Sequence, residues 1–181
     1  MSTYPGLAAL SNQLSLESTR LRLRQFRESD LDTLADIYAD QETMRYIGEG
    51  KTFTRGETWR AIAGMLGHWM LRGYGMWALE LKSTGELIGR VGFIEPDGWP
   101  GFELGWTVAR PHQGRGYATE AAAAALDHAF ITLGKSRVIS LIRPENFASI
   151  RVAEKLGETL REEITLLGSV ARLYAIERIN P

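Results

Sequence analysis

The stretch VARPHQGRGYATEAAAAAL, residues 108–126, runs from an apolar segment through two glycines and an arginine into a run of alanines. Gly114 and Gly116 leave the backbone bare, and Arg115 places a positive charge between them. If a strand ends and a helix begins here, the first N–H groups of that helix lack partners and lie at the positive end of its dipole. Such a junction binds phosphate groups. The alternative is a plain strand-to-helix turn whose glycines serve geometry alone.

The two common nucleotide-binding motifs do not fit this stretch. A dinucleotide-binding G-x-G-x-x-G loop needs a third glycine where Thr119 stands, and the G-x-x-x-x-G-K-[ST] phosphate loop is absent. The residues therefore predict an anion site without identifying the anion. General nucleotide binding stays as a disfavoured hypothesis.

The rest of the chain alternates strand and helix patterns around this junction. Strict alternation or short apolar runs predict strands over 20–24, 75–82, 86–95, 102–110 and 137–142, and a terminal hairpin over 158–179. Helical spacing predicts helices after Ser29, from Thr54 to about residue 73, from the quoted stretch to about residue 132, and over 147–156. This order predicts one α/β domain (α+β by some schemes) over 19–181, with three layers and a mixed sheet of about seven strands flanked by about four helices. Residues 1–18 are expected to be a partly ordered lead-in.

Two helix starts and one apolar face can be assigned more closely. Ser29 is a candidate N-cap, and Thr54 with Glu57 has the spacing of a capping box. The apolar face of the second helix is expected to consist of Trp59, Ile62, Ala63, Leu66, Trp69 and Met70.

Composition excludes several classes of function. The chain has 181 residues, 44% apolar, with a net charge of −1, so no basic field points to nucleic acid. No apolar run approaches the roughly 20 residues of a membrane span, and residues 1–20 lack the basic segment and long apolar core expected of a secretory signal. Cysteine is absent, which excludes disulfides and an acyl-cysteine intermediate and suits the cytoplasm. His68, His112 and His128 are too scattered for a metal site and are expected on the surface or in packing.

Two spaced motifs resemble the GNAT superfamily of acyl-CoA N-acyltransferases. In the quoted stretch Gln113, Gly116 and Ala118 occupy the positions of its central motif, after Val108 and Pro111. Downstream, ENFASIRVAEKLGE places Asn146, Ser149, Lys155 and Gly157 at the intervals of a second motif. The element order also matches the family from about Thr19 to Ile179, and the resemblance implies a GNAT-like fold with a mostly antiparallel sheet. The Asn-x-x-Ser form of the second motif and the long second helix look most like the branch of ribosomal-protein N-terminal acetyltransferases.

The resemblance implies a binding site for acetyl-CoA and no metal. The backbone of Gly114, Arg115, Gly116, Tyr117, Ala118 and Thr119 would hold the pyrophosphate, with Gln113 beside it. The strand end at Trp106, Thr107 and Val108 would pair with the pantetheine arm and polarise the thioester carbonyl through an N–H. Asn146 and Ser149 would contact the pantetheine, although Asn146 reads equally as a helix N-cap.

The sequence departs from the family at two positions. Ala153 stands where many relatives carry a tyrosine that protonates the departing thiolate, so Ser149, or a water that it holds, is the remaining candidate for that role. Glu158 replaces a phenylalanine of the second motif. That change is expected to remove a packing residue without affecting the chemistry.

Glu103 is the candidate general base. In FELGWTV it shares a strand face with Gly105 and Thr107, opposite Phe102 and Leu104. Burial of that face under helices would raise the pKa of Glu103 toward neutrality, which suits a base. The alternative is an edge-exposed or ion-paired glutamate. In the resembling branch a glutamate on this strand acts through water.

Two classes of function follow. The first is an N-acetyltransferase that moves an acetyl group from acetyl-CoA to a primary amine, on a small molecule or a protein N-terminus, by direct transfer in a ternary complex. The second is a catalytically silent acyl-CoA-binding or sensing module. The expected partners are an amine acceptor and, as in similar proteins, a second copy in a homodimer, with no nucleic acid and no membrane. Four aromatic residues fall in the region that lines acceptor pockets in relatives, with core packing expected for at least half of them: Trp59, Trp69, Tyr74 and Trp77.

Overall fold

One sheet of eight strands runs through the computed structural model, which describes residues 15–178. The strand order is β1-β2-β3-β4-β5-β6-β8-β7, and every pair is antiparallel except β5 with β6. The strands are β1 (Ser15–Glu17), β2 (Leu21–Arg24), β3 (Met76–Leu81), β4 (Leu87–Ile94), β5 (Glu103–Val108), β6 (Arg137–Ile142), β7 (Thr159–Leu166) and β8 (Ser169–Glu177). The α-helices are α2 (Leu31–Ala39), α3 (Gln41–Met44), α4 (Arg55–Arg72), α5 (Tyr117–Ile131) and α6 (Phe147–Lys155).

The predicted mixed, mostly antiparallel sheet is confirmed, with one more strand and one more helix than expected. The extra strand is β1, which lies inside the 1–18 lead-in and pairs with β2. It is only three residues long, too short to show an alternating pattern. The extra helix is α3, a single turn started by the side chain of Asp40, which accepts from the Thr43 N–H. Ser29 is not an N-cap, because a 3-10 turn over Glu28–Asp30 precedes α2 and Asp30 takes that position.

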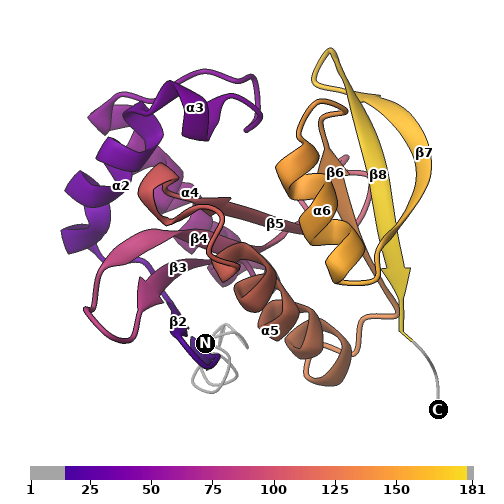
Figure 1. The fold of residues 1–181 in the computed structure, drawn as a ribbon, viewed down its shortest axis with the longest axis horizontal. Coiled ribbons are helices and arrows are strands. Elements are labelled where there is room, and N and C mark those ends of the chain that lie inside the picture. Colours follow the sequence, from indigo (N-terminus) through magenta and orange to yellow (C-terminus); the bar gives the residue numbers. More distant parts are fainter. Residues whose placement is uncertain (1–14, 179–181) are drawn as a thin grey trace, which may run out of the picture.

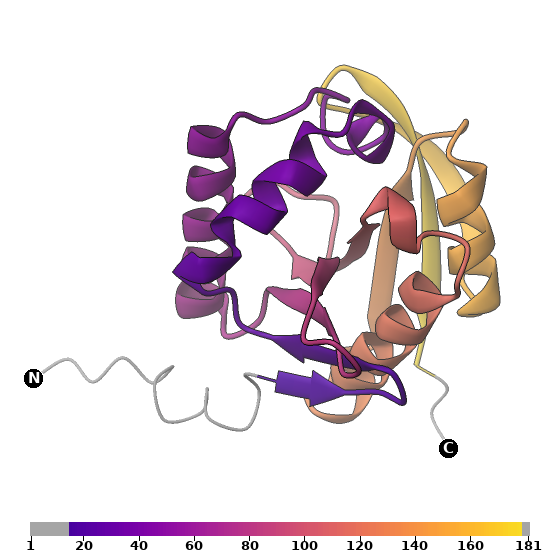
Figure 2. The same cartoon turned by 60° about the vertical axis from the view of Figure 1, so that its left-hand side comes forward.

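Helices cover both faces of the sheet (Figures 1 and 2). Figure 2 shows α2 and α4 on one face, where they enclose a core that includes Leu34, Tyr38 and Met76. On the other face α5 packs its small residues against the sheet, and Trp77 and Phe93 fill the space beside them. The fully buried alanines of α5 let the helix axis approach the strands closely: Ala121, Ala122, Ala125 and Ala129. Within residues 15–178, no helix is both long and apolar enough to cross a membrane.

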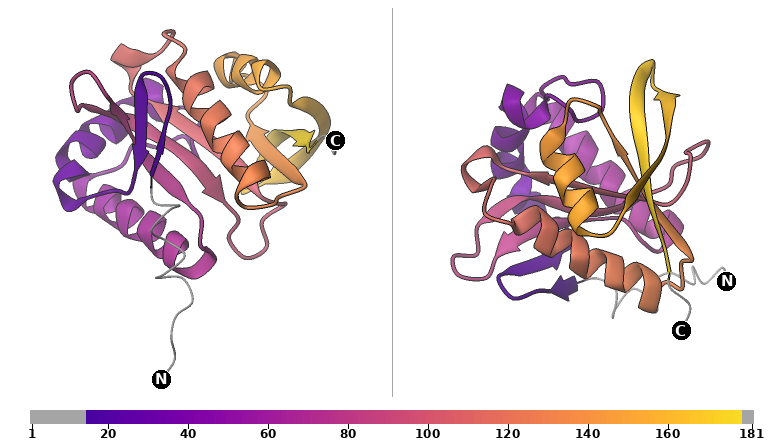
Figure 3. Two further views of the ribbon diagram at one scale, coloured as in Figure 1. Left: turned by 90° about the horizontal axis from the view of Figure 1, so that it is seen from below. Right: turned by 45° about the vertical axis from the view of Figure 1, so that its right-hand side comes forward.

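The sheet opens between β5 and β6. Whereas β4 pairs with β5 from Gly89–Val108 to Ile94–Glu103, β5 pairs with β6 at one position only, Glu103 with Ile139. Beyond that point the strands diverge, and β6 continues with the long β7–β8 hairpin and α6 as a second half of the molecule (Figures 1 and 3). The backbone of β5 toward Val108 therefore has an edge that β6 does not cover.

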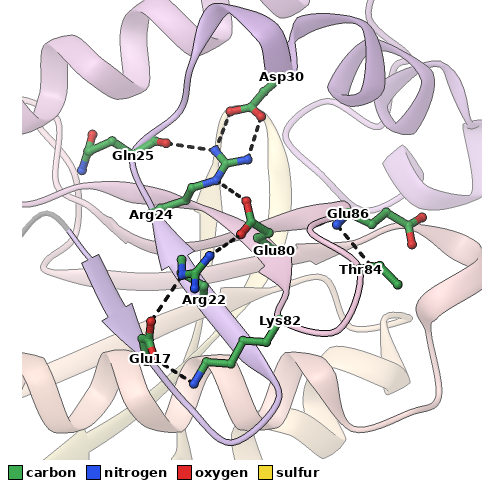
Figure 4. Close-up of polar contacts among 9 residues, drawn as sticks. All are labelled: Glu17, Arg22, Arg24, Gln25, Asp30, Glu80, Lys82, Thr84 and Glu86. Atoms are coloured by element: carbon green, nitrogen blue, oxygen red, sulfur yellow. Dashed lines mark hydrogen bonds and ion pairs between the residues drawn. The ribbon is translucent and has the colours of Figure 1, made fainter.

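A buried ion-pair network ties the start of α2 to the sheet (Figure 4). The guanidinium of Arg24 donates two hydrogen bonds to Asp30, at 2.7 and 2.8 Å, and its Nε donates to Glu80 at 2.6 Å. Burial acts to raise the pKa of Glu80, but its hydrogen bonds with Arg24 and Arg22 outweigh burial and hold that pKa below its usual value. Loss of one partner in a buried network of this kind costs about 3–5 kcal/mol, so the network fixes where α2 and α3 stand.

The capping box of α4 is confirmed, but its apolar face is narrower than predicted. Thr54 accepts from the Glu57 N–H, and the Glu57 carboxylate accepts from the Thr54 N–H. Ile62 and Trp69 are buried, whereas Trp59 is 50% and Met70 49% exposed. These two lie at the margins of a helix that touches the sheet along one stripe, so spacing alone assigned them wrongly to the core.

Candidate active site

The quoted stretch forms the junction that its glycines predicted. After β5, a 3-10 turn over Arg110–His112 leads into the loop, and α5 begins at Tyr117. Gly114 and Gly116 have φ of +74° and +81°, a left-handed conformation that glycine adopts without steric cost. Gly116 is the N-cap and supplies no side-chain hydrogen bond, so the first N–H groups of α5 remain available to an anion.

The β1–β2 connection braces this loop from outside. Arg20 donates to the carbonyl oxygen of Arg115 at 3.1 Å and from Nε to Glu120 in the first turn of α5 at 2.6 Å. Its guanidinium carbon also lies 4.5 Å from the centroid of the Tyr117 ring. On the inner side, Gln113 donates to the carbonyl oxygen of Val108 at 2.9 Å. The start of α5 and the end of β5 are thus held together before any ligand binds.

A cleft of about 840 Å³ opens at this junction, and we call it the larger cleft. Nearly all the predicted cofactor-binding residues line it: Trp106, Thr107, Val108, Gln113, Gly114, Gly116, Tyr117, Ala118, Thr119, Asn146 and Ser149. Arg115 is the exception, because the residues lining the cleft do not include it. Positive charge comes instead from Arg110, Arg151 and Lys155, the last two one helical turn apart on α6.

A second cleft of about 350 Å³, the smaller cleft, lies between β5 and β6 and reaches the segment 46–48 that follows α3 and the β7–β8 turn. The two clefts are contiguous, because both are lined by Tyr46, Ile47, Trp106, Asn146 and Ser149. Glu103 lines the smaller cleft only. A two-substrate site requires this arrangement, with two cavities that meet at a shared wall.

Glu103 is a buried carboxylate, as its place in the strand predicted. It is 9% exposed and has no ion-pair partner within 4 Å among residues 15–178. Trp99 donates to its Oε2 at 2.6 Å. Burial raises the pKa of Glu103 to about 7, against the opposing effects of hydrogen bonds from Trp99 and the Leu141 N–H and of the charge on Arg90. Near neutral pH this carboxylate can therefore accept or release a proton.

Ser149 and Asn146 form the wall shared by the two clefts. The Asn146 side chain accepts from the Ser149 N–H at 3.2 Å, so it caps α6. The indole N–H of Trp106 donates to Ser149 Oγ at 3.2 Å and links α6 to β5 across the opening in the sheet. Ala153 is fully buried in the small core under α6, where Tyr174 of β8 also packs.

The replacement of the family's phenylalanine by Glu158 was expected only to remove a packing residue, but the Glu158 side chain is itself buried and hydrogen-bonded. Its carboxyl is buried, 2% exposed, and lies 3.1 Å from Ser140 Oγ, which itself lies 2.9 Å from the carbonyl oxygen of Leu104. One hydroxyl proton cannot serve both acceptors, so both contacts are hydrogen bonds only when Glu158 is protonated and donates to Ser140. Burial, with a smaller contribution from the charge of Glu103, raises the pKa of Glu158 to about 7 against the opposing effect of its hydrogen bond with Ser140.

The aromatic residues from the acceptor region are mostly core. Trp69 and Trp77 are buried edge-to-face, 5.0 Å between ring centroids, and Tyr74 packs on Phe102. Trp59 lies exposed on α4. None of the four lines either cleft. The histidines are packing or loop residues: His128 is buried against Trp77, His68 accepts from the Glu95 N–H, and His112 contacts Glu86.

Sequence reasoning missed two residues of the smaller cleft. Trp99 lies in the loop PDGWPG, where the prolines and glycines predict a turn and no functional role. Arg90 lies in a predicted strand whose other residues are mostly apolar. Both depend on the pairing of β4 with β5, which no local pattern reveals. Arg151 and Lys155 could have been found from their spacing of four on the predicted 147–156 helix.

The family model of the acetyltransferase (GNAT) domain matches residues 20–159, more than half of the chain. The chain is 35% identical to the uncharacterized protein YkkB of Bacillus subtilis over 156 residues, which cover 82% of this chain and 87% of that protein. It is 30% identical to the uncharacterized N-acetyltransferase YnaD of the same organism, over 80% of this chain and 82% of the relative.

Solved structures share this fold. An acetyltransferase from Agrobacterium tumefaciens superposes with a TM-score of 0.80 at 33% identity, covering 91% of this chain and 94% of the other. A RimL ribosomal L7/L12 α-N-protein acetyltransferase, solved with coenzyme A, has a TM-score of 0.74 over 88% of this chain and 95% of that one. At 23% identity this second likeness concerns the fold alone.

Proposed function

Because the chain belongs to the GNAT acetyltransferase family, we propose that it moves the acetyl group of acetyl-CoA to a primary amine by direct transfer in a ternary complex. The acceptor is a small molecule or a protein N-terminus. The observation that carries the proposal is the pair of contiguous clefts that meet at Trp106, Asn146 and Ser149, with Glu103 in the smaller one. One cleft holds the donor and the other the acceptor.

The residues of the larger cleft fit acetyl-CoA, which supplies an activated acetyl thioester. Bare backbone at Gly114 and Gly116 and the uncapped start of α5 suit a pyrophosphate. The uncovered edge of β5 at Thr107 and Val108 suits an extended amide chain, which binds as an added strand does. The buried Oγ1 of Thr107 has no hydrogen-bond partner among residues 15–178, and a polar ligand bound in the larger cleft would supply one.

In the proposed reaction, Glu103 accepts the proton that the amine loses, through an intervening water. The amine nitrogen forms the new C–N bond, the C–S bond of the thioester breaks, and a backbone N–H of β5 stabilises the oxyanion between these events. Ser149, or a water that it holds, protonates the departing thiolate. The products are the N-acetylated amine and CoA.

The experiment that tests the proposal is an acceptor screen with acetyl-CoA. Small amines and short peptides with varied N-termini are incubated with the protein, free CoA is titrated, and products are weighed by mass spectrometry. We expect CoA release together with a mass gain of one acetyl group on at least one amine.

A catalytically silent module gives a different result. It binds acetyl-CoA, seen by calorimetry, but acetylates no amine of the panel. That combination would reject the proposed reaction and favour sensing.

A further inference from the structure

The smaller cleft has a pronounced charge pattern. Among its lining side chains only three are charged, Arg90, Arg143 and Glu103. Glu103 must be ionised to accept a proton, so the working cleft carries two positive charges and one negative charge. An acceptor with several positive charges would be repelled there, whereas an acceptor with an anionic group beside its amine would be attracted.

Arg90 and Glu103 occupy the same face of the sheet, at two ends of a short floor. Arg90 on β4 lies opposite Thr107, and Glu103 on β5 lies opposite Ile94. Between these rows stands the pair Gly92 and Gly105, and the Met76 side chain of β3 lies over it, with Cε 3.2 Å from where a Gly105 Cβ would be. Each row is separated from the next by two residues, about 7 Å along the strand. A small molecule in the cleft beside Met76 can place one group toward Arg90 and another toward Glu103.

Arg90 is half-buried and lacks a carboxylate partner. Within the part of the chain that the structure describes, it makes no ion pair, and its Nε is buried without a hydrogen-bond acceptor. Its guanidinium carbon lies 6.0 Å from the centroid of the Tyr38 ring, and the buried Tyr38 side chain is a neutral hydrogen-bonding neighbour there. Arg143, by contrast, already donates to the carbonyl oxygen of Gly48 at 2.7 Å. A buried polar group without a partner carries a desolvation cost that a ligand can remove.

We infer that the acceptor is a primary amine that carries a carboxylate, which Arg90 binds while Glu103 takes the proton of the amine. The inference rests on the proposed function and specifies its acceptor. The acceptor that carries both groups is a small amino-acid-like molecule, because the smaller cleft measures about 350 Å³. Peptides with an acidic residue next to their N-terminus share the chemistry and form a separate arm of the test.

The test compares matched acceptors with and without the carboxylate, and kcat/KM is calculated on the concentration of unprotonated amine, because an adjacent carboxylate also lowers the pKa of the amine. Amino acids are paired with their decarboxylated amines, and peptides with Asp or Glu at the second position are paired with their Asn or Gln forms. For the wild-type protein we expect kcat/KM to be at least about tenfold higher with the carboxylate, the ratio that one charged hydrogen bond provides. If the preference occurs among peptides only, the small-molecule source is wrong.

Variants assign the preference to Arg90. Arg90→Gln is expected to reduce the ratio to about one, and Arg90→Lys to keep part of it, since a lysine retains the charge without the fork of donors. Arg60→Gln, on the exposed side of α4 and outside both clefts, is the matched control and should keep the full ratio. Calorimetry with CoA on each variant shows that the donor site is intact.

Two results would overturn the inference. Equal kcat/KM for both members of every pair would show that the protein does not recognise the carboxylate. An unchanged ratio in Arg90→Gln would show that Arg90 is not the residue that recognises it. Neither result contradicts the proposed acetyl transfer. Failure of all amines, with acetyl-CoA bound, overturns the proposed function and this inference with it.

Discussion

Two carboxylates, Glu103 and Glu158, define the chemistry at the scale of single residues. Both are buried near the point where β5 and β6 separate, and burial raises both pKa values to about 7. They differ in surroundings. Glu103 lines the smaller cleft, whereas Glu158 bonds to Ser140 beneath α6. We therefore assign proton transfer to Glu103 and local structure to Glu158.

Glu158→Gln tests that division. Because the folded-state pKa lies above the unfolded value, the native carboxyl stabilises the fold at low pH and loses this contribution as pH rises from about 4.5 to about 7. Glutamine mimics the protonated acid and cannot ionise. Relative to wild type, the variant should gain roughly 1–3 kcal/mol of unfolding free energy between pH 5 and pH 8.

Urea unfolding at several pH values measures this gain, with acetyl transfer followed in parallel. The exposed Glu162 on β7 offers a control, Glu162→Gln, with little effect at either pH. A difference between Glu158→Gln and wild type that does not vary with pH would show that Glu158 is not a buried neutral acid.

At the scale of elements, the β5–α5 junction is the decisive feature. Its loop is braced by Arg20, Glu120 and Gln113, and its glycines leave the start of α5 open. The brace is mostly exposed, and ion pairs of this kind add only about 0–1 kcal/mol, so its main effect is to order the loop.

Gly116→Ala should weaken acetyl-CoA binding by about tenfold or more, because a φ of +81° is strained for alanine and a shift of the loop would move the first N–H groups of α5. Gly134→Ala is the matched control, with φ of +64°, open space around it, and a position beyond the far end of α5. Both variants should lose about 1 kcal/mol of stability from backbone strain. Isothermal calorimetry measures the affinity of each variant for acetyl-CoA. Equal affinities of the two variants would show that Gly116 is not part of the donor site.

Elements were also what the sequence predicted best. The alternation in Leu21–Arg24, the short apolar run of Arg137–Ile142 and the capping box at Thr54 depend on neighbours along the chain, so local patterns were sufficient. The short β1 and α3 have three and four residues, too few to show a periodicity in the sequence.

The same distinction applies to the site. The face of Glu103 followed from alternation on its own strand, and its burial from the helices that flank it. The contact with Trp99, the nearness of Arg90 and the burial of Glu158 arise from pairing between strands and from the packing of α6. Arg115 was placed in the cleft from its position between two glycines, but residue order does not determine the direction of a loop side chain.

At the scale of the whole molecule, the sheet splits into two halves, and we propose that the ligands bind where the halves separate. A donor bound there contacts β5, α5 and α6 together, so binding should stabilise both halves. At a concentration about a hundredfold above Kd, the expected gain is about 2.7 kcal/mol, or roughly 5–10 °C in Tm.

Differential scanning fluorimetry with acetyl-CoA, CoA, ATP and NAD measures this gain. We expect acetyl-CoA and CoA to raise Tm by this amount at matched concentrations, and ATP and NAD by less than half as much, because only the CoA compounds reach the β5 edge. Equal shifts for all four compounds would favour general nucleotide binding.

The central claim is that Glu103 takes the proton of an acceptor amine, and the pH dependence of kcat/KM tests it most directly. Loss of the amine proton gives log kcat/KM a slope of one, and ionisation of Glu103 adds a second unit below about pH 7. Wild type should therefore change slope from two to one near pH 7. Glu103→Gln should be about 10²–10³-fold slower, with a slope of one throughout and unchanged affinity for acetyl-CoA. If the variant retains both the rate and the change of slope, Glu103 is not the base.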